Sequence, residues 1–263
     1  MNLYQQTYDC LMLREVHKKQ ACVKNLYSNW KNNKLKREDT ELHQIKNPGR
    51  PDKPELIHPG KLKRRKLGSI LGRATLVHAI LHIEFNAINL ALDAIYRFRD
   101  MPDEYYDDWL KVASEESYHF SLLEDRLHDL GHIYGDFPAH NGLWEMVLKT
   151  DHDVLTRMAL VPRVLEARGL DVTPGMILRL EEAGDCKTVD VLRIILRDEI
   201  GHVAIGSRWF RYCCELQNAN PEKTFRNLLM EYMGGGLKEP LHTKARLQAG
   251  FTQKEIDELV RLT

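Results

Sequence analysis

Two short motifs in the sequence combine a carboxylate with an imidazole three residues later. Glu116 is followed by His119, and Glu199 is followed by His202. Residues i and i+3 share one face of an α-helix, so each pair can bind a metal ion from one side. The sequence therefore predicts two helices that each carry a Glu-x-x-His chelate.

A single glutamate precedes each motif at a matched distance. Glu84 lies 32 residues before Glu116, and Glu166 lies 33 residues before Glu199. Each glutamate falls on an otherwise apolar helical face. Four carboxylates in a helical core need a counter-charge, because a buried unpaired carboxylate costs several kcal/mol or takes up a proton. Two divalent ions would balance the four carboxylates and leave both imidazoles neutral.

The Glu-x-x-His motif is weak on its own. Twenty Glu and twelve His in 263 positions give about one such motif by chance, and the chain has four. The other two are Glu55–His58 and Glu239–His242. Neighbouring prolines deny these two the regular helix that would aim both side chains at one point, so we exclude them as ligands.

An alternative reading exists for each single glutamate. Glu84 or Glu166 could point outward or pair with an arginine, and Arg163 and Arg168 lie close to Glu166 in the sequence. Six residues in one register favour a metal site instead. The predicted ligands are Glu84, Glu116, His119, Glu166, Glu199 and His202.

A second acid precedes each motif, Glu115 in one case and Asp198 in the other. A histidine ligand usually donates its other N–H to a carboxylate. We predict that Asp198 supports His119 and that Glu115 supports His202; the alternative is that both acids are surface residues. His78 and His82 are spaced for a zinc ion, but without a third ligand we expect them to be packing or rim residues.

Four long helices are predicted to position these ligands. The first begins at an N-cap, Ser69, and runs about thirty residues; the second begins at Pro102 and Asp103 and ends near Leu130. The third is expected from Leu143 to Arg168, ending at Gly169, with a bend at Pro162. The fourth is expected from about Asp185 to Leu216.

Shorter elements are predicted outside these four helices. We expect one or two helices in residues 3–32, an extended segment over 47–60, and a connecting helix over 171–183 that begins near Pro174. A helix near 221–233, a break at 234–236 and a last helix from Thr252 should follow. Thr252 and Glu255 match a capping box. The predicted parts are a basic N-terminal segment (1–66), a four-helix bundle (67–217) and a C-terminal extension (218–263).

Charge is unevenly distributed along the chain. Residues 1–66 carry sixteen Lys/Arg and seven Asp/Glu, whereas residues 67–263 carry twenty-two and thirty-one. The basic segment, with its run from Lys61 to Lys66, either binds an anion such as nucleic acid or docks on the acidic remainder. Five cysteines without a CxxC, no signal peptide and no apolar run of about eighteen residues predict a cytoplasmic protein without a membrane span.

With the six ligands in place, the chain resembles the ferritin-like superfamily of di-iron carboxylate proteins. More closely, it resembles an uncharacterised bacterial ferritin-like family, the family of unknown function that is numbered DUF455. The closer likeness lies in residues 82–102 (HIEFNAINLALDAIYRFRDMP), 134–146 (YGDFPAHNGLWEM), 159–175 (ALVPRVLEARGLDVTPG) and 195–210 (ILRDEIGHVAIGSRWF). The resemblance implies an all-α fold, a ferritin-like four-helix bundle with helical N- and C-terminal extensions.

The resemblance to di-iron proteins also implies a function. Two iron ions, or manganese in their place, would act with O₂ or a peroxide on an unknown substrate, with an electron donor. The alternative is an iron-handling ferroxidase without an organic substrate, and a metal-free structural protein is the third hypothesis. A related branch of the superfamily contains a tRNA hydroxylase, which makes a nucleic-acid partner for the basic segment a suggestion.

Overall fold

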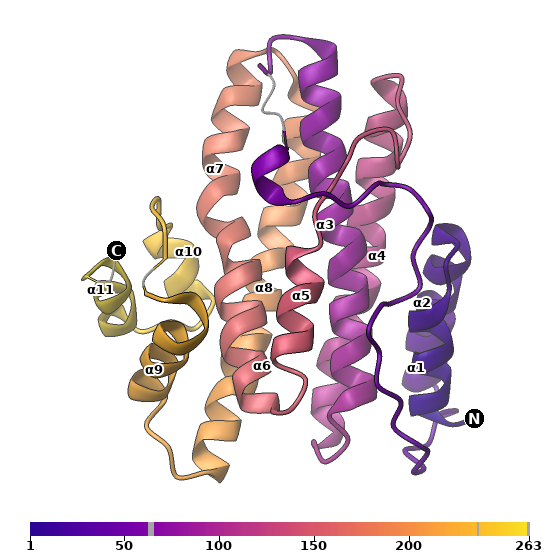
Figure 1. Ribbon diagram of the computed structural model, residues 1–263, viewed down its shortest axis with the longest axis vertical. Coiled ribbons are helices and arrows are strands. Elements are labelled where there is room, and N and C mark those ends of the chain that lie inside the picture. The colour runs from indigo at the N-terminus through magenta and orange to yellow at the C-terminus, as the bar shows by residue number, and fades with distance from the viewer. Residues whose placement is uncertain (63–65, 236, 262–263) are drawn as a thin grey trace. The chain divides into compact units, whose positions relative to one another are not determined.

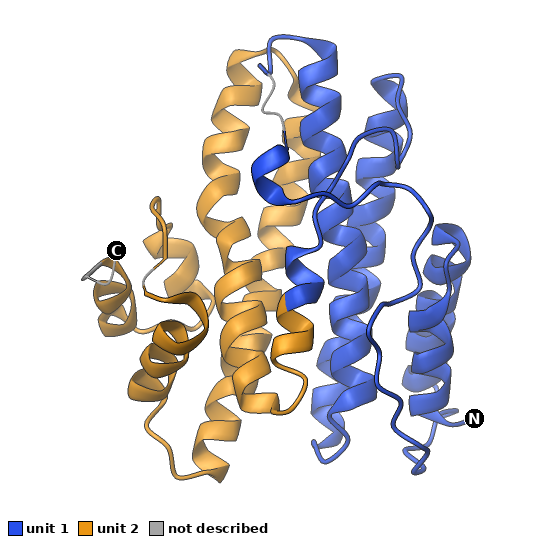
Figure 2. Ribbon diagram, in the orientation of Figure 1, with its two compact units in different colours: residues 1–145 blue, residues 146–263 orange. Residues whose placement is uncertain are grey.

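The computed structural model describes residues 1–62, 66–235 and 237–261, and every regular element in them is helical (Figure 1). This confirms the predicted all-α class. The chain divides into two compact units, residues 1–145 and 146–263 (Figure 2). The predicted limits at 66 and 217 remain a prediction, and each unit is described by itself below.

Unit 1 is built around two long helices, α3 (Ile70–Arg97) and α4 (Asp103–Asp129), which pack side by side (Figure 1). Two N-terminal helices cover them: α1 (Leu3–Met12) packs on α3, and α2 (Val16–Lys31) packs on α4. Residues 47–60 form no regular helix, as predicted, until the 3₁₀ turn η1 (Pro59–Lys61) begins at their end. Helix α5 (Gly142–Lys149) spans the limit between the units.

Both long helices of unit 1 begin where the sequence predicts. The Ser69 hydroxyl accepts a hydrogen bond of 3.1 Å from the Gly72 N–H, which satisfies one of the donors exposed at the start of α3. Pro102 is the N-cap of α4. The predicted apolar stripes of both helices are buried. Their members are Ala74, Val77, Leu81, Ile88, Ala91, Ile95, Trp109, Val112, Leu123, Leu127 and Leu130.

The basic N-terminal segment contacts the acidic start of α4. Arg37 Nε lies 3.0 Å from Asp103 Oδ1, and Lys31 Nζ lies 3.4 Å from Asp107 Oδ1. The Trp30 indole N–H also donates to Asp107, at 2.8 Å. These contacts agree with docking of the segment on the acidic part of the chain. Residues 63–65 of the basic run lie outside the described residues.

Unit 2 contains α6 (Val154–Leu160), the π-helix η2 (Val161–Glu166), α7 (Ala167–Glu182) and α8 (Cys186–Leu216). The first three follow one another without a loop, and each packs on α8. The predicted start of α8 is confirmed, because the Asp185 side chain accepts a hydrogen bond of 3.1 Å from the Thr188 N–H. The C-terminal helices are α9 (Pro221–Met233), α10 (Thr243–Gln248) and α11 (Gln253–Arg261).

The prediction of one helix from Leu143 to Arg168 is wrong in its interior. The helix breaks at 150–153, where Asp153 caps α6 through a hydrogen bond of 2.8 Å from the Thr156 N–H. Aspartate favours such a cap over a position inside a helix. Leu148, expected on the buried face, is 36% exposed.

The predicted helix end at Gly169 is also wrong. Helix α7 continues through Gly169 and Pro174 to Glu182, so the expected connecting helix is part of it. A glycine and a proline inside a helix cost about 1 and 3 kcal/mol. Burial of the apolar side chains of Leu170 and Leu180 on the same helix offsets part of that cost. Tertiary packing here overrides the local signal.

The C-terminal predictions are confirmed except for one missed element. The capping box forms, because Glu255 Oε2 accepts the Thr252 N–H at 2.8 Å and Thr252 Oγ1 accepts the Glu255 N–H at 3.1 Å. Gly234 ends α9 with a φ of 70°, and Gly236 lies outside the described residues. Helix α10 was not predicted, since its six residues are too short to show a period.

One described helix meets the length and composition expected of a membrane span. In α3, an 18-residue window has a mean hydropathy of 1.3, and 78% of that window is buried inside the protein. A core helix passes the same test, and the burial of α3 matches that role.

Candidate metal centre

The candidate ligands of unit 1 lie together inside the protein. His119 Nδ1 is 3.4 Å from Glu84 Oε2 and 3.4 Å from Glu116 Oε2. Each of the three residues offers one ligand atom, and these atoms lie within 4.8 Å of one another. Exposed fractions are 3% for Glu84 and 0% for Glu116 and His119. Two oxygens and one imidazole at this spacing suit a divalent first-row metal.

Helix periodicity explains why these three residues meet. Glu84 lies three residues after Leu81 on the stripe of α3 that packs against α4. Glu116 and His119 occupy neighbouring turns on the facing stripe of α4. Neither helix has an interior proline, so the register is undisturbed from cap to ligand.

The electrostatics of this cluster show how strongly it holds a positive charge. Burial alone would lower the pKa of His119. Hydrogen bonds to Glu116 and Glu84, together with their negative charges, raise the pKa of His119 overall to about 11. A proton on the imidazole therefore supplies the positive charge when no metal is bound. A metal ligand must be deprotonated, so metal binding here would release that proton.

The candidate ligands of unit 2 lie on α8 and at the end of η2. His202 Nδ1 is 3.7 Å from Glu199 Oε1, which places the second Glu-x-x-His pair on one face of α8. His202 is 0% exposed, and the Glu199 side chain is 12% exposed. Glu166 is the last residue of η2 and is partly buried. The structure thus brings together the two members of the motif in this unit.

The ring of Pro162 in η2 packs closely against Gly206 in α8. A Cβ placed on Gly206 would lie 2.3 Å from the Cβ and Cγ atoms of Pro162. Only glycine accommodates that approach. Gly206 lies one turn after His202, and Pro162 lies four residues before Glu166. At Pro162, where a bend was predicted, the chain forms a π-helix. A π-helix often marks a functional site.

The two arginines that could have neutralised Glu166 have other contacts. Arg163 Nη2 donates to Glu255 Oε1 at 2.6 Å, with both side chains buried. Three phenylalanine rings surround the same guanidinium, with centroid distances of 4.6 Å for Phe210, 4.2 Å for Phe225 and 4.4 Å for Phe251.

Arg168, the second of these arginines, contacts the segment between α9 and α10. It donates to the carbonyl oxygens of Lys238 at 2.6 Å and Pro240 at 2.9 Å. Both guanidinium groups thus hold the C-terminal helices to this part of unit 2. The role of Glu166 as a metal ligand remains a prediction.

Comparison with known proteins places the chain in a family. The family described as "Protein of unknown function (DUF455)" matches residues 12–257. The chain belongs to the DUF455 family. A Haemophilus influenzae relative described as "Uncharacterized protein" is 50% identical over 214 residues, which cover 79% of this chain and 74% of the relative. No solved structure matches the chain. The DUF455 match includes all six candidate ligands.

The two acids that precede the motifs have contacts on their own helices in this DUF455 protein. Glu115 Oε2 accepts a hydrogen bond of 3.0 Å from Lys111 Nζ, and Asp198 Oδ1 accepts one of 2.8 Å from Arg197 Nε. The support of His202 by Glu115 and of His119 by Asp198 remains a prediction.

His78 and His82 are packing residues of the DUF455 fold, as predicted. The Gly135 N–H donates to His78 Nε2 at 2.9 Å, and His82 Nδ1 lies 2.8 Å from the Tyr134 hydroxyl. Burial lowers the pKa of each of the two imidazoles to about 4. Both rings are therefore neutral at pH 7. They hold the loop after α4 on α3, a contact between distant segments that sequence spacing does not reveal.

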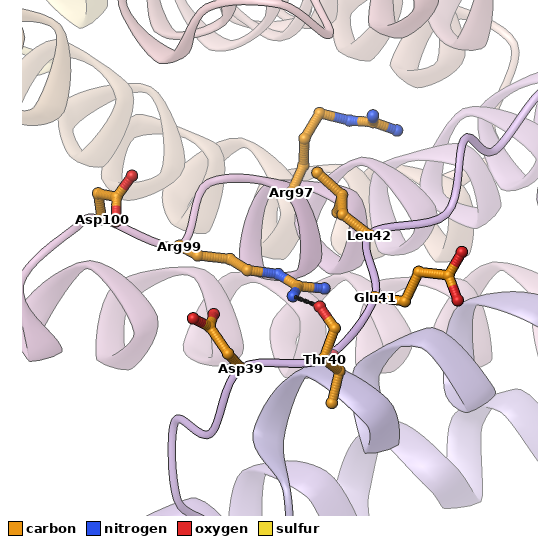
Figure 3. Close-up of a pocket in the computed structure, with 7 residues that line it drawn as sticks. All are labelled: Asp39, Thr40, Glu41, Leu42, Arg97, Arg99 and Asp100. Carbon is orange, nitrogen blue, oxygen red and sulfur yellow. Dashed lines mark hydrogen bonds between the residues drawn. The ribbon is translucent and has the colours of Figure 1, made fainter.

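A cavity of about 580 Å³ in unit 1 has polar walls (Figure 3). Figure 3 shows Arg99 reaching to the carbonyl oxygen of Thr40. Arg97 donates to Asp93, with 2.7 Å between Nη2 and Oδ1. None of its lining residues is a candidate ligand. They are Asp39, Thr40, Glu41, Leu42, Arg97, Arg99 and Asp100. This cavity differs from the apolar pocket expected beside a substrate-oxidising centre.

Proposed function

We propose that this protein binds two metal ions, with iron as the physiological metal, and acts as an oxidoreductase that uses O₂ or a peroxide. The proposed ligands are Glu84, Glu116, His119, Glu166, Glu199 and His202. The buried cluster of Glu84, Glu116 and His119 carries the proposal, because three ligand atoms lie within 4.8 Å of one another. In this proposal α3, α4, the α6–η2–α7 segment and α8 form a ferritin-like four-helix bundle around the metals.

Charge balance supports two metals rather than one. Each half of the ligand set contributes two carboxylates and one imidazole in the same order along the chain. Four carboxylates match two divalent cations, and two neutral imidazoles complete the set. The raised pKa of His119 in unit 1, caused by Glu116 and Glu84, supports a demand for positive charge in this half of the ligand set. A single divalent ion would leave half of the carboxylate charge uncompensated.

Two iron ions, when bound, supply electrons in pairs for the reduction of O₂ or a peroxide. The residues of the chain hold the metals and exclude water, since Glu84, Glu116, His119 and His202 are all nine-tenths or more buried. Hydroxylation of an organic substrate is the specific form of the proposal. An iron-handling ferroxidase uses the same ligands without an organic substrate, and manganese fits the same donors.

Metal analysis of the purified protein is the decisive measurement. We expect two metal ions per chain in the wild-type protein. The Glu116→Ala variant should lose more affinity than the 10–100-fold that loss of an outer-shell partner costs. Glu104→Ala is the matched control, because Glu104 is exposed on the same helix. Full metal content in Glu116→Ala, or a metal-free wild type after loading with iron and manganese, would refute the site.

The reaction type is tested with metal-loaded protein. The protein is reduced without oxygen, and O₂ is then added with and without candidate substrates. O₂ consumption coupled to substrate oxidation supports the oxidoreductase. O₂ consumption that stops once the bound iron is oxidised, together with a closed shell of many subunits in size-exclusion chromatography, supports iron handling.

A further inference from the structure

Two thiols and a buried amine meet between α1 and α2. Cys10 on α1 and Lys19 on α2 are both 0% exposed, while Cys22, three residues after Lys19, is partly buried. The spacing of three places Lys19 and Cys22 on the same face of α2. That face packs against α1, where Cys10 lies. None of these three residues belongs to the proposed metal site.

The contacts within this cluster hold the two thiols together. The Cys10 thiol donates to the Lys19 carbonyl oxygen over 3.7 Å. Cys22 lies three residues after Lys19, so Cys10 contacts the turn of α2 that carries the second thiol. Each of the two thiols also changes the pKa of the other. A disulfide requires two cysteines on closely packed segments, and this contact between α1 and α2 meets that requirement.

The amine of Lys19 is fixed beside the thiols. Its Nζ atom donates to the Leu11 carbonyl oxygen at 2.8 Å and to Asn89 Oδ1, and it lies 5.3 Å from the centre of the Phe85 ring. Burial lowers the pKa of Lys19 to about 7, although the charges of nearby thiolates oppose that change. A cation at this position stabilises a thiolate, the reactive form of cysteine.

The two thiols differ in a way that assigns their roles. The interaction with Cys10 lowers the pKa of Cys22, whereas the interaction with Cys22 and burial raise the pKa of Cys10. Cys22 is also the more exposed of the two. A more acidic and more accessible cysteine reacts first with an oxidant, and a neighbouring thiol then resolves the product. Cys22 is the attacking residue and Cys10 the resolving residue.

We propose that Cys10 and Cys22 form a redox-responsive thiol pair that hydrogen peroxide converts to a reversible disulfide. In the first step the Cys22 thiolate attacks one peroxide oxygen, the O–O bond breaks, and the leaving hydroxide takes a proton to become water. Cys22 is then a sulfenic acid. In the second step the Cys10 sulfur attacks the Cys22 sulfur, the S–S bond forms, and the S–O bond breaks with release of a second water. Two thiols lose two electrons in total, and the peroxide gains them.

The remaining cysteines provide internal controls. Cys186 is exposed, whereas Cys213 and Cys214 are buried in unit 2. Burial raises the pKa of Cys213 to about 12 and that of Cys214 to about 11, so neither is a reactive thiolate at pH 7. If solvent exposure alone decided which cysteine reacts, peroxide would oxidise Cys186 first. If the surroundings of the thiols decide it, peroxide oxidises Cys22 and Cys10.

The test uses the full-length protein with a chelator present, so that its outcome does not depend on the metal site. Reduced protein is treated with hydrogen peroxide and then denatured for thiol titration. We expect the count to fall from five thiols to three and to return to five with dithiothreitol. Trypsin cleaves at Arg14, Lys18 and Lys19, so a cross-linked pair of peptides containing Cys10 and Cys22 identifies the bond by mass.

Serine variants assign the order of reaction. In Cys10→Ser, Cys22 should accumulate as a sulfenic acid that dimedone traps. In Cys22→Ser, Cys10 should keep its thiol, and Cys186→Ser should still form the disulfide. Far-UV circular dichroism tests whether each variant is folded. The peptide map of the wild-type protein tests the disulfide even if a variant does not fold. Five intact thiols after peroxide, oxidation confined to Cys186, or cross-links only between chains would each overturn the proposal.

Discussion

The two units carry the same set of candidate ligands on different kinds of backbone. In unit 1, Glu84 lies on an unbroken α-helix of 28 residues, and its partner α4 is equally regular. In unit 2, Glu166 ends a π-helix of six residues that joins α6 to α7. The corresponding glutamates are spaced almost equally in the sequence. Equal spacing therefore does not imply equal local structure.

The difference shows what each unit needs to hold its ligands. In unit 1, two regular helices that pack side by side put Glu84 opposite Glu116 and His119. In unit 2, the π-helix depends on contacts made elsewhere, namely Pro162 on Gly206 and Arg163 on Glu255. A π-helix is rare because its hydrogen-bond geometry is less favourable than that of an α-helix. Unit 2 should therefore be the more sensitive to substitutions distant from the ligands.

The largest expected effect is the loss of the buried ion pair in unit 2. Arg163→Met leaves Glu255 buried without its cation, which should lower the free energy of unfolding by about 3–5 kcal/mol. Arg193→Met is the matched control, because the Arg193–Glu181 pair is exposed on both sides and should contribute at most about 1 kcal/mol. Urea denaturation measures both.

A second variant tests whether charge or packing accounts for that loss. Adding Glu255→Gln to Arg163→Met should recover part of the stability, because the buried negative charge is then removed. Equal losses in the single and double variants would contradict the electrostatic explanation. The lost stability would then come from the packing of Arg163 against Phe210, Phe225 and Phe251.

A smaller effect is expected from filling the contact between Pro162 and α8. Gly206→Ala introduces a Cβ that meets the proline ring, and such overpacking typically costs about 1–3 kcal/mol. Gly201→Ala is the control on the same helix, where a Cβ meets nothing within 4 Å. It should stabilise the helix by about 0.5–1 kcal/mol. Thermal unfolding of metal-free protein compares them, and equal melting temperatures would show that η2 does not need the contact.

The smallest expected difference lies in the helix caps. Ser69→Ala in unit 1 and Asp153→Ala in unit 2 each remove one side chain that accepts a backbone N–H, and each should cost about 0.5–2 kcal/mol. The two losses should be similar, because each cap accepts one backbone N–H at the start of its helix. Urea denaturation measures both losses. A much larger loss for Asp153→Ala would contradict this expectation and show that unit 2 depends more strongly on its helix cap.

Local capping signals in the sequence predict helix starts correctly in both units. Ser69, Pro102 and Asp185 begin helices where their side chains or ring geometry predict, and the Thr252–Glu255 capping box forms as expected. The third long helix was mispredicted, because Gly169 and Pro174 are local breakers whose effect tertiary burial outweighs. The proximity of Cys10 to Cys22 was not predicted, because residues on two separate helices meet only through packing.

The sequence by itself determined the helical class, most helix limits and the pairing of each glutamate with its histidine, since these depend on the period of one helix and on local caps. Only the tertiary structure decided that His119 lies between Glu84 and Glu116, that η2 widens into a π-helix, and that Arg163 binds Glu255. The physical reason is the range of the interactions. Periodicity and capping depend on residues within a few positions of one another. Burial and ion pairing depend on residues that are distant along the chain.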